Sequence, residues 1–136
     1  MADRYSLGAH GEAAAARYLE GLGFRVVERN YRCKIGEIDL ICTRGKLLVF
    51  VEVKARRSCA YGAPQEAVDG RKARQIRRIA AWYLTQGARI KRFYDDFDIR
   101  FDVVEVRAEH EAGWDGDGAD GDAEVAFAVN HIERAF

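Results

Sequence analysis

Residues 36–54 have the sequence GEIDLICTRGKLLVFVEVK, which predicts a β-hairpin because two β-rich runs flank a short polar turn. If Arg44 and Gly45 form the turn, facing residues have numbers that sum to 89, and Asp39 lies opposite Phe50. Side chains alternate between the two faces of a strand, so one face of the hairpin is almost wholly apolar. The other face is expected to carry Glu37, Asp39, Phe50, Glu52 and Lys54.

The carboxylates on this second face repel one another unless a cation joins them. Asp39 and Glu52 are predicted to lie diagonally across the strand pair, about 7–8 Å apart at the backbone, which is near enough for both to hold one ion. The carbonyl of Val53 is a further oxygen ligand, and the ammonium of Lys54 is placed to orient or deprotonate a water molecule. The pattern favours Mg²⁺ or Mn²⁺ and phosphodiester hydrolysis. The simpler alternative is a solvent-facing side on which Lys54 pairs with Glu52 and nothing binds.

The chain of 136 residues is long enough for one domain with a core and too short for two. Hydrophobic periodicity predicts helices at residues 6–22 and 67–84, and Pro64 suits the first turn of the second helix, which residues 67–84 then continue. Strands are predicted, besides the hairpin, at residues 24–31, 98–106 and 124–132. Residues 109–124 are rich in Gly and Asp and predict an acidic mobile loop. The order α-β-β-β-α-β-β indicates a single α/β domain over residues 1–136.

Charge is unevenly distributed along the chain, although 22 basic and 22 acidic residues balance overall. Residues 1–92 contain 19 basic and 9 acidic side chains, whereas residues 93–124 contain 2 basic and 12 acidic ones. A basic body favours a polyanionic partner, and a well-solvated mixed surface is the alternative. The cysteines lack the spacing of a zinc or redox site, and no apolar run is long enough to span a membrane. A cytoplasmic protein with no membrane association is therefore expected.

A basic run lies in the second predicted helix, between residues 71 and 78. No acidic residue occurs from 71 to 86, so salt bridges along the helix do not account for these charges. Together with the arginines that follow Lys54, the run predicts a phosphate-contacting surface, and a solvated helix face is the alternative. This predicted surface comprises Arg56, Arg57, Arg71, Lys72, Arg74, Arg77 and Arg78.

Glu12 lies in the first predicted helix among small residues, with Gly8 and Gly11 before it and four alanines at 13–16 after it. Small neighbours let a helix approach a sheet closely, which would direct this carboxylate at the hairpin site. An ordinary solvated glutamate is the alternative.

Four blocks of the sequence together resemble the YraN family of endonuclease-like proteins, which is related to archaeal Holliday-junction resolvases. They are GEAAAARYLEGLGFRVVERNYR at 11–32, GEIDLI at 36–41, VFVEVKAR at 49–56 and VNHIERAF at 129–136. The set covers nearly the whole chain after residue 10. In addition, Asp39 followed by EVK at 52–54 is similar to the PD-(D/E)xK nuclease signature, with Ile38 in place of its proline.

The resemblance implies a restriction-endonuclease-like domain with a mixed central sheet flanked by helices. It implies metal-binding acids at Asp39 and Glu52 and a catalytic lysine at Lys54. It also implies a helix acid at Glu12 and an assisting polar residue at Gln75. Mg²⁺ or Mn²⁺ is the implied cofactor and DNA the implied partner. A homodimer is compatible with this resemblance, because resolvase-like relatives act as dimers.

The expected function is metal-dependent endonucleolytic cleavage of DNA, with branched or otherwise non-linear DNA as one candidate substrate. Two other functions stay open at this point. One is a catalytically silent nuclease-fold module that binds nucleic acid. The other is a protein-interaction domain whose acidic loop at 109–124 recruits a basic partner or shields the basic face from DNA.

Overall fold

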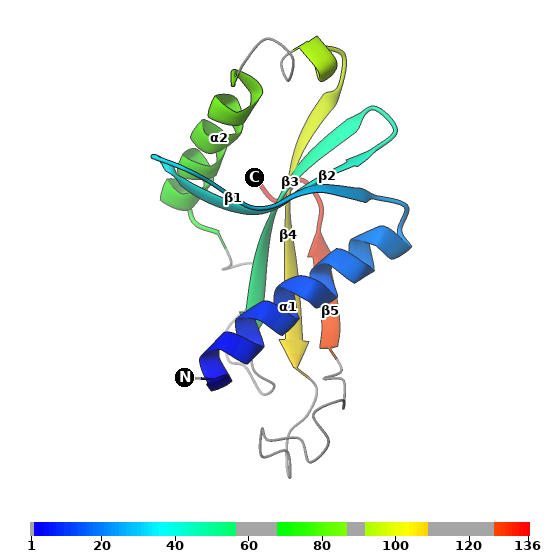
Figure 1. Cartoon of the computed structure of the whole chain (residues 1–136), viewed down its shortest axis with the longest axis vertical. Coiled ribbons are helices and arrows are strands. Elements are labelled where there is room, and N and C mark those ends of the chain that lie inside the picture. Colours follow the sequence, from blue (N-terminus) through cyan, green and yellow to red (C-terminus); the bar gives the residue numbers. More distant parts are fainter. Residues whose placement is uncertain (1, 57–67, 87–91, 109–126) are drawn as a thin grey trace.

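Five strands form one twisted sheet in the spatial order β1-β2-β3-β4-β5 (Figure 1). The computed structural model describes residues 2–56, 68–86, 92–108 and 127–136. Its elements are α1 (Ala2–Gly21), β1 (Arg25–Cys33), β2 (Gly36–Arg44), β3 (Leu47–Arg56), α2 (Gly70–Leu84), β4 (Asp98–Ala108) and β5 (Phe127–Ile132). The predicted order of helices and strands and the single α/β domain are confirmed.

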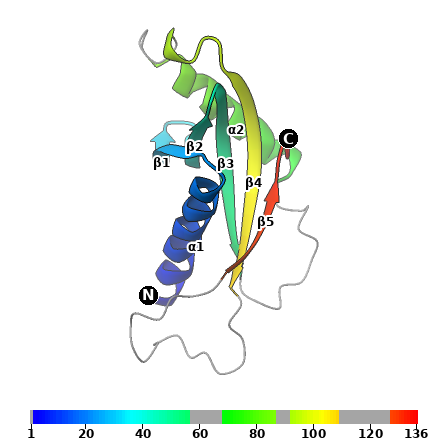
Figure 2. The same ribbon diagram turned by 90° about the vertical axis from the view of Figure 1, so that its right-hand side faces the viewer.

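Neighbouring strands are antiparallel except β3 and β4, which are parallel. A parallel pair requires a crossover connection, and α2 lies in the sequence between these two strands. The two helices cover opposite faces of the sheet (Figure 2). The expected mixed sheet flanked by helices is thus confirmed. No helix within the described ranges is long and apolar enough to cross a membrane.

The middle of β3 is buried on both faces. Val49 and Val51 pack toward α1, whereas Leu48 and Phe50 pack toward α2 beside Ile76. The sequence predicts only one buried face for the hairpin, and this prediction is wrong for the middle of β3. The reason is that α2 covers the second face there, so Phe50 has no exposed surface.

The hairpin turn lies one residue later than predicted. Residues 45 and 46 form the turn and Arg44 pairs with Leu47, so facing numbers sum to 91. Gly45 has a φ of 61°, which suits the first central position of a type II′ turn and explains the shift. A register change of two residues keeps each β3 side chain on its predicted face. If this register is extended beyond Leu40 and Val51, the last paired residues, Asp39 lies directly opposite Glu52 instead of diagonal to it.

The second helix begins at Gly70, which is later than the start near Pro64 that the sequence predicts. Asp69 caps it, because its Oδ1 accepts a hydrogen bond from the backbone N–H of Lys72 at 2.9 Å. Pro64 and the acidic loop at 109–124 lie outside the described residues, as do the first three residues of the predicted last strand.

Gly11 allows α1 to pack directly on the sheet. A Cβ added at this position would lie 2.8 Å from the Cβ of Ala55 and 3.1 Å from Cγ2 of Val106. Either distance is shorter than ordinary van der Waals contact, so a larger residue would push the helix away from β3 and β4. The close approach predicted from the small residues around Glu12 is confirmed at Gly11, whereas Gly8 has no neighbour within 4 Å of an added Cβ.

Candidate active site

The candidate site begins where β2 and β3 separate. Leu40 and Val51 are the last recorded pair, and beyond them the backbone N–H of Val53 donates to Oδ2 of Asp39 at 2.8 Å. The Asp39 carboxylate therefore takes the place of a β2 carbonyl as hydrogen-bond acceptor. One carboxylate oxygen is anchored to the backbone of β3 in this way, and among the described residues no hydrogen bond occupies the other.

Strict alternation is interrupted at Asp39, because Ile38 packs with the α2-side core and Leu40 with the α1-side core. This corrects the prediction that Glu37 shares one face with Asp39 and Glu52 through simple alternation. Glu37 is instead 42% exposed and pairs with Arg32, whose Nε lies 3.0 Å from its Oε1. Two anchored carboxylates, and not three, form the centre of the site.

Burial, together with the charges of Glu52, Glu12 and Glu37, raises the pKa of Asp39 to about 7 against the opposing hydrogen bond from Val53. A carboxyl group with this pKa is half protonated near neutral pH. A cation bound between these acids would remove the repulsion and favour the ionised form. The electrostatics of Asp39 thus fit a cation-binding role.

Glu52 is buried, with 7% of its surface exposed, and two lysines approach it. The Nζ of Lys54 lies 3.5 Å and the Nζ of Lys72 lies 3.4 Å from Oε2 of Glu52. Sequence reasoning assigned Lys72 to the phosphate-contacting surface and missed its contact with Glu52. The contact depends on where α2 begins, and the sequence pattern places that start too early.

Glu12 extends the site from α1 on the other side of the sheet split. Burial raises the pKa of this half-buried carboxyl, the Asn30 side chain lowers it, and the charges of Glu37 and Glu52 raise it. The charge of Glu12 acts on Asp39 in turn. The structure therefore brings the helix acid into the electrostatic neighbourhood of the two hairpin acids, as predicted from its small neighbours.

Gln75 positions the strand that carries Asp39. Its Nε2 donates to the carbonyl of Ile35 at 2.9 Å, immediately before β2. Gly36 has a φ of 153°, and a Cβ there would lie 2.9 Å from this same Nε2. The contact ties α2 to the start of β2 and so supports the strand that carries Asp39.

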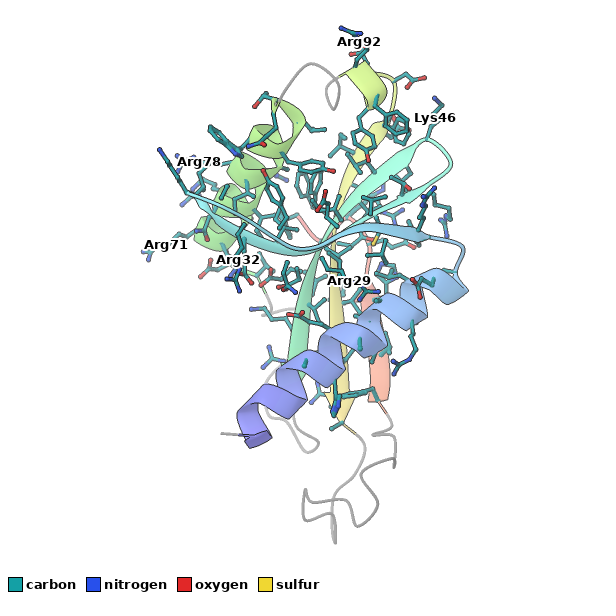
Figure 3. The ribbon with its side chains drawn as sticks, viewed as in Figure 1. Arg29, Arg32, Lys46, Arg71, Arg78 and Arg92 are labelled. Atoms are coloured by element: carbon teal, nitrogen blue, oxygen red, sulfur yellow. The ribbon has the colours of Figure 1, made fainter. Side chains whose placement is uncertain are left out.

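The predicted phosphate-contacting surface is only partly brought together. Arg71, Arg74 and Arg78 are exposed along α2, and Arg71 and Arg78 point away from the sheet on the same side as Arg32 (Figure 3). Arg77 instead lies over the rings of Phe101 and Phe136, with centroid distances of 5.6 and 5.9 Å. Arg57 lies outside the described residues, and Arg56 pairs with Glu105.

A second buried acid, Asp102, has a structural setting. Arg100 donates two hydrogen bonds to it at 2.9 and 2.8 Å, and Nε2 of His131 lies 2.7 Å from its Oδ2. Burial opposes ionisation, but the hydrogen bonds from His131 and Arg100 lower the pKa of Asp102. Because its oxygens are occupied by partners on β4 and β5, this acid is not available to a ligand.

Within the described ranges, no group of three or more His, Cys, Asp or Glu side chains is arranged to hold a metal ion. The donors nevertheless fit Mg²⁺ or Mn²⁺ in kind. Asp39 and Glu52 offer carboxylate oxygens and Val53 a backbone carbonyl, and Mg²⁺ is commonly bound by one or two carboxylates while it keeps several waters.

The fold and the site together define a single-domain α/β protein with an acid and lysine centre at a split between two strands. A sequence model described as uncharacterised protein family UPF0102 matches residues 11–106, and the chain belongs to this family.

Relatives in the family match over most of their length. The chain is 49% identical to a UPF0102 protein of Moorella thermoacetica over 76% of this chain and 84% of the relative. It is 41% identical to one of Alkaliphilus oremlandii, over 96% and 97% of the two chains. It is 48% identical to one of Rhodococcus jostii, over 81% and 89%.

Proposed function

We propose that this protein is a cytoplasmic PD-(D/E)xK-type endonuclease that hydrolyses phosphodiester bonds in DNA with Mg²⁺ or Mn²⁺. The observation that carries the proposal is the joint position of Asp39, Glu52 and Lys54 at the split between β2 and β3. Asp39 and Glu52, with the carbonyl of Val53, would hold the metal ion. When bound, the ion would polarise a phosphoryl oxygen and stabilise the charge that develops there.

The side chains around this centre have separate tasks in the proposal. Lys54 keeps 29% of its side chain exposed, so its ammonium can reach a water molecule or a phosphate oxygen while it stays next to Glu52. Lys72 adds a second positive charge beside Glu52 that would attract the phosphate. The N–H of Val53 holds Asp39 in one orientation, which lowers the reorganisation needed when substrate binds.

The test is a cleavage assay on labelled linear duplex, single-stranded, flap and four-way DNA with Mg²⁺ or Mn²⁺. Wild type should cut at least one substrate, and Asp39→Asn should lower the rate at least about 100-fold. The matched control is Asp95→Asn, an exposed aspartate outside the site, which should leave the rate unchanged. The proposal is falsified if wild type cuts none of these substrates above the level of Asp39→Asn.

A second candidate function is a catalytically silent module that binds DNA. The contact of two lysines with Glu52 favours it, because these cations already compensate the charge of that acid. Such a module would bind DNA with a steep salt dependence and cut none of it. Asp39→Asn would leave that binding unchanged or strengthen it, since one repulsive charge near the phosphates is removed.

The preferred DNA structure and the assembly state belong to the same proposal. A four-way junction contains two strands to cut, which would suit a homodimer with two such sites. Light scattering of the protein alone and bound to a four-way junction would measure the number of subunits. A monomer in both states would contradict the dimeric version without affecting the nuclease proposal.

A further inference from the structure

Another charged cluster, centred on Glu105 of β4, lies beside the candidate site. Glu105 is buried, with 2% of its surface exposed, and is the register partner of Lys54 across the parallel pair β3 and β4. Two arginines hold its carboxylate. Nε of Arg56 lies 2.8 Å from Oε2, and Nη2 of Arg107 lies 3.1 Å from Oε1.

This cluster has one more positive charge than its buried acid requires. One arginine is sufficient to pair with a single carboxylate, yet each oxygen of Glu105 has an arginine of its own. A guanidinium has five N–H donors, and among the described residues these contacts use one nitrogen of each arginine. The side chains of Arg56 and Arg107 are 34% and 27% exposed. Both guanidinium groups are therefore held in place while part of each remains open to solvent.

The two arginines continue the candidate site along the sheet. Arg56 follows Lys54 by two residues on β3, so both side chains emerge on the same face about 6.6 Å apart along the strand. Arg107 is the register partner of Arg56 on β4 and lies beside it. Glu52 and Lys54 thus form, with the arginine pair, a row of charged side chains that runs toward the C-terminal ends of β3 and β4.

We propose that Arg56 and Arg107, held by Glu105, form a binding site for a DNA phosphate next to the one that is cleaved. The bidentate donors of arginine match phosphate geometry, and a fixed guanidinium loses little freedom on binding. The position of the cleaved phosphate rests on the proposed function, whereas phosphate binding by the pair does not. The site gives the bound strand a direction, from Glu52 toward Arg56, and requires a substrate longer than a single phosphodiester.

The test measures the salt dependence of binding to a fluorescent 20-base-pair DNA duplex in EDTA, so that cleavage plays no part. The slope of log K against log salt concentration is negative, and Arg107→Ala should reduce its magnitude by about 1, as expected for one lost phosphate contact. Arg107→Lys should keep the wild-type slope, because the charge is retained. The matched control is Arg92→Ala, which removes an exposed arginine far from the pair, near the hairpin turn (Figure 3), and should also leave the slope unchanged.

Thermal unfolding of each variant guards against a trivial loss of structure. If Arg107→Ala is unfolded, Arg107→Gln is measured in its place, because it keeps a hydrogen-bond donor for Glu105 and removes only the charge. A folded Ala or Gln variant with the slope of Arg92→Ala overturns the proposal and leaves the cluster as an internal salt bridge. If Arg107→Ala reduces the magnitude of the slope and the wild-type protein cuts no DNA, the phosphate site is supported while the nuclease proposal fails. The two failures are therefore distinguishable.

Discussion

The α2-facing side of β3 has two halves that differ in what covers them. Leu48 and Phe50 in the first half have no exposed surface. Lys54 and Arg56 in the second half keep 29% and 34% of their side chains exposed. Both halves belong to one strand and one face, so the difference comes from α2, whose first residue, Gly70, follows the cap at Asp69. The start of a helix can thus divide one strand face into a buried core and a partly exposed charged segment.

The largest expected effect is a difference in stability between substitutions in the two halves. Phe50→Ala should lower the free energy of unfolding by about 3–5 kcal/mol, because it leaves a cavity under α2. Lys54→Ala should change it by less than about 1 kcal/mol, since that side chain is part-exposed. Urea denaturation followed by circular dichroism measures both values. Equal losses for the two variants would show that the halves do not differ as the structure indicates.

The two lysines that contact Glu52 are expected to differ in how much each contributes to the cleavage rate. Lys54→Met should lower the cleavage rate about 100-fold, as for loss of a group that acts on the attacking water. Lys72→Met should lower it only about tenfold, because its charge attracts phosphate from the first turn of α2. Single-turnover kinetics at saturating DNA separate these values from changes in binding. A larger loss for Lys72 would reverse the two assignments.

On the face of the sheet opposite Lys54 and Arg56, α1 packs closely against β3 and β4. Substitutions at Gly11 test this packing. Gly11→Ala should destabilise the protein by about 1–3 kcal/mol, because the new methyl group would meet Ala55 and Val106. Gly8→Ala is the matched control on the same helix. It has open space and should stabilise the protein by about 0.5–1 kcal/mol through helix propensity. Thermal unfolding of the pair gives both signs, and the same sign for both variants would contradict the close packing.

The last effect concerns the pH dependence of stability that Asp39 contributes. Its pKa is about 7 in the folded protein and near the ordinary value of 3.8 when unfolded, so the folded state binds the proton more tightly. The stability from this group is fully present below about pH 4 and is lost as pH rises to about 7. Without divalent metal, Asp39→Asn should therefore be more stable than wild type at pH 8, by up to about 4 kcal/mol for a shift of roughly three pKa units.

Urea denaturation at pH 5 and pH 8 in EDTA measures this effect, with Asp95→Asn as the control for loss of a solvent-exposed charge. The advantage of Asp39→Asn should shrink at pH 5, where the wild-type carboxyl is protonated in the folded state. An advantage of the same size at both pH values would mean that Asp39 does not titrate between them.

Local patterns predicted the elements well but placed their contacts imperfectly. The α-β-β-β-α-β-β order follows from periodicity, and the β3 faces follow from alternation over residues 47–56. The register was wrong because a glycine with positive φ moved the turn by one residue. Alternation failed at Asp39, where a side chain replaces a backbone acceptor. Neither event has a signature in the hydrophobic pattern.

The sequence by itself determined the class of the fold, the hairpin, and the residues Asp39, Glu52 and Lys54 as candidates for chemistry. Only the tertiary structure decided that α2 buries Phe50, that Lys72 reaches Glu52, and that Glu105 holds Arg56 and Arg107. The physical reason is the range of the forces involved. Alternation and helix periodicity act between residues a few positions apart, whereas these contacts, apart from the one between Glu105 and Arg107, join residues 20 to 49 positions apart in the chain.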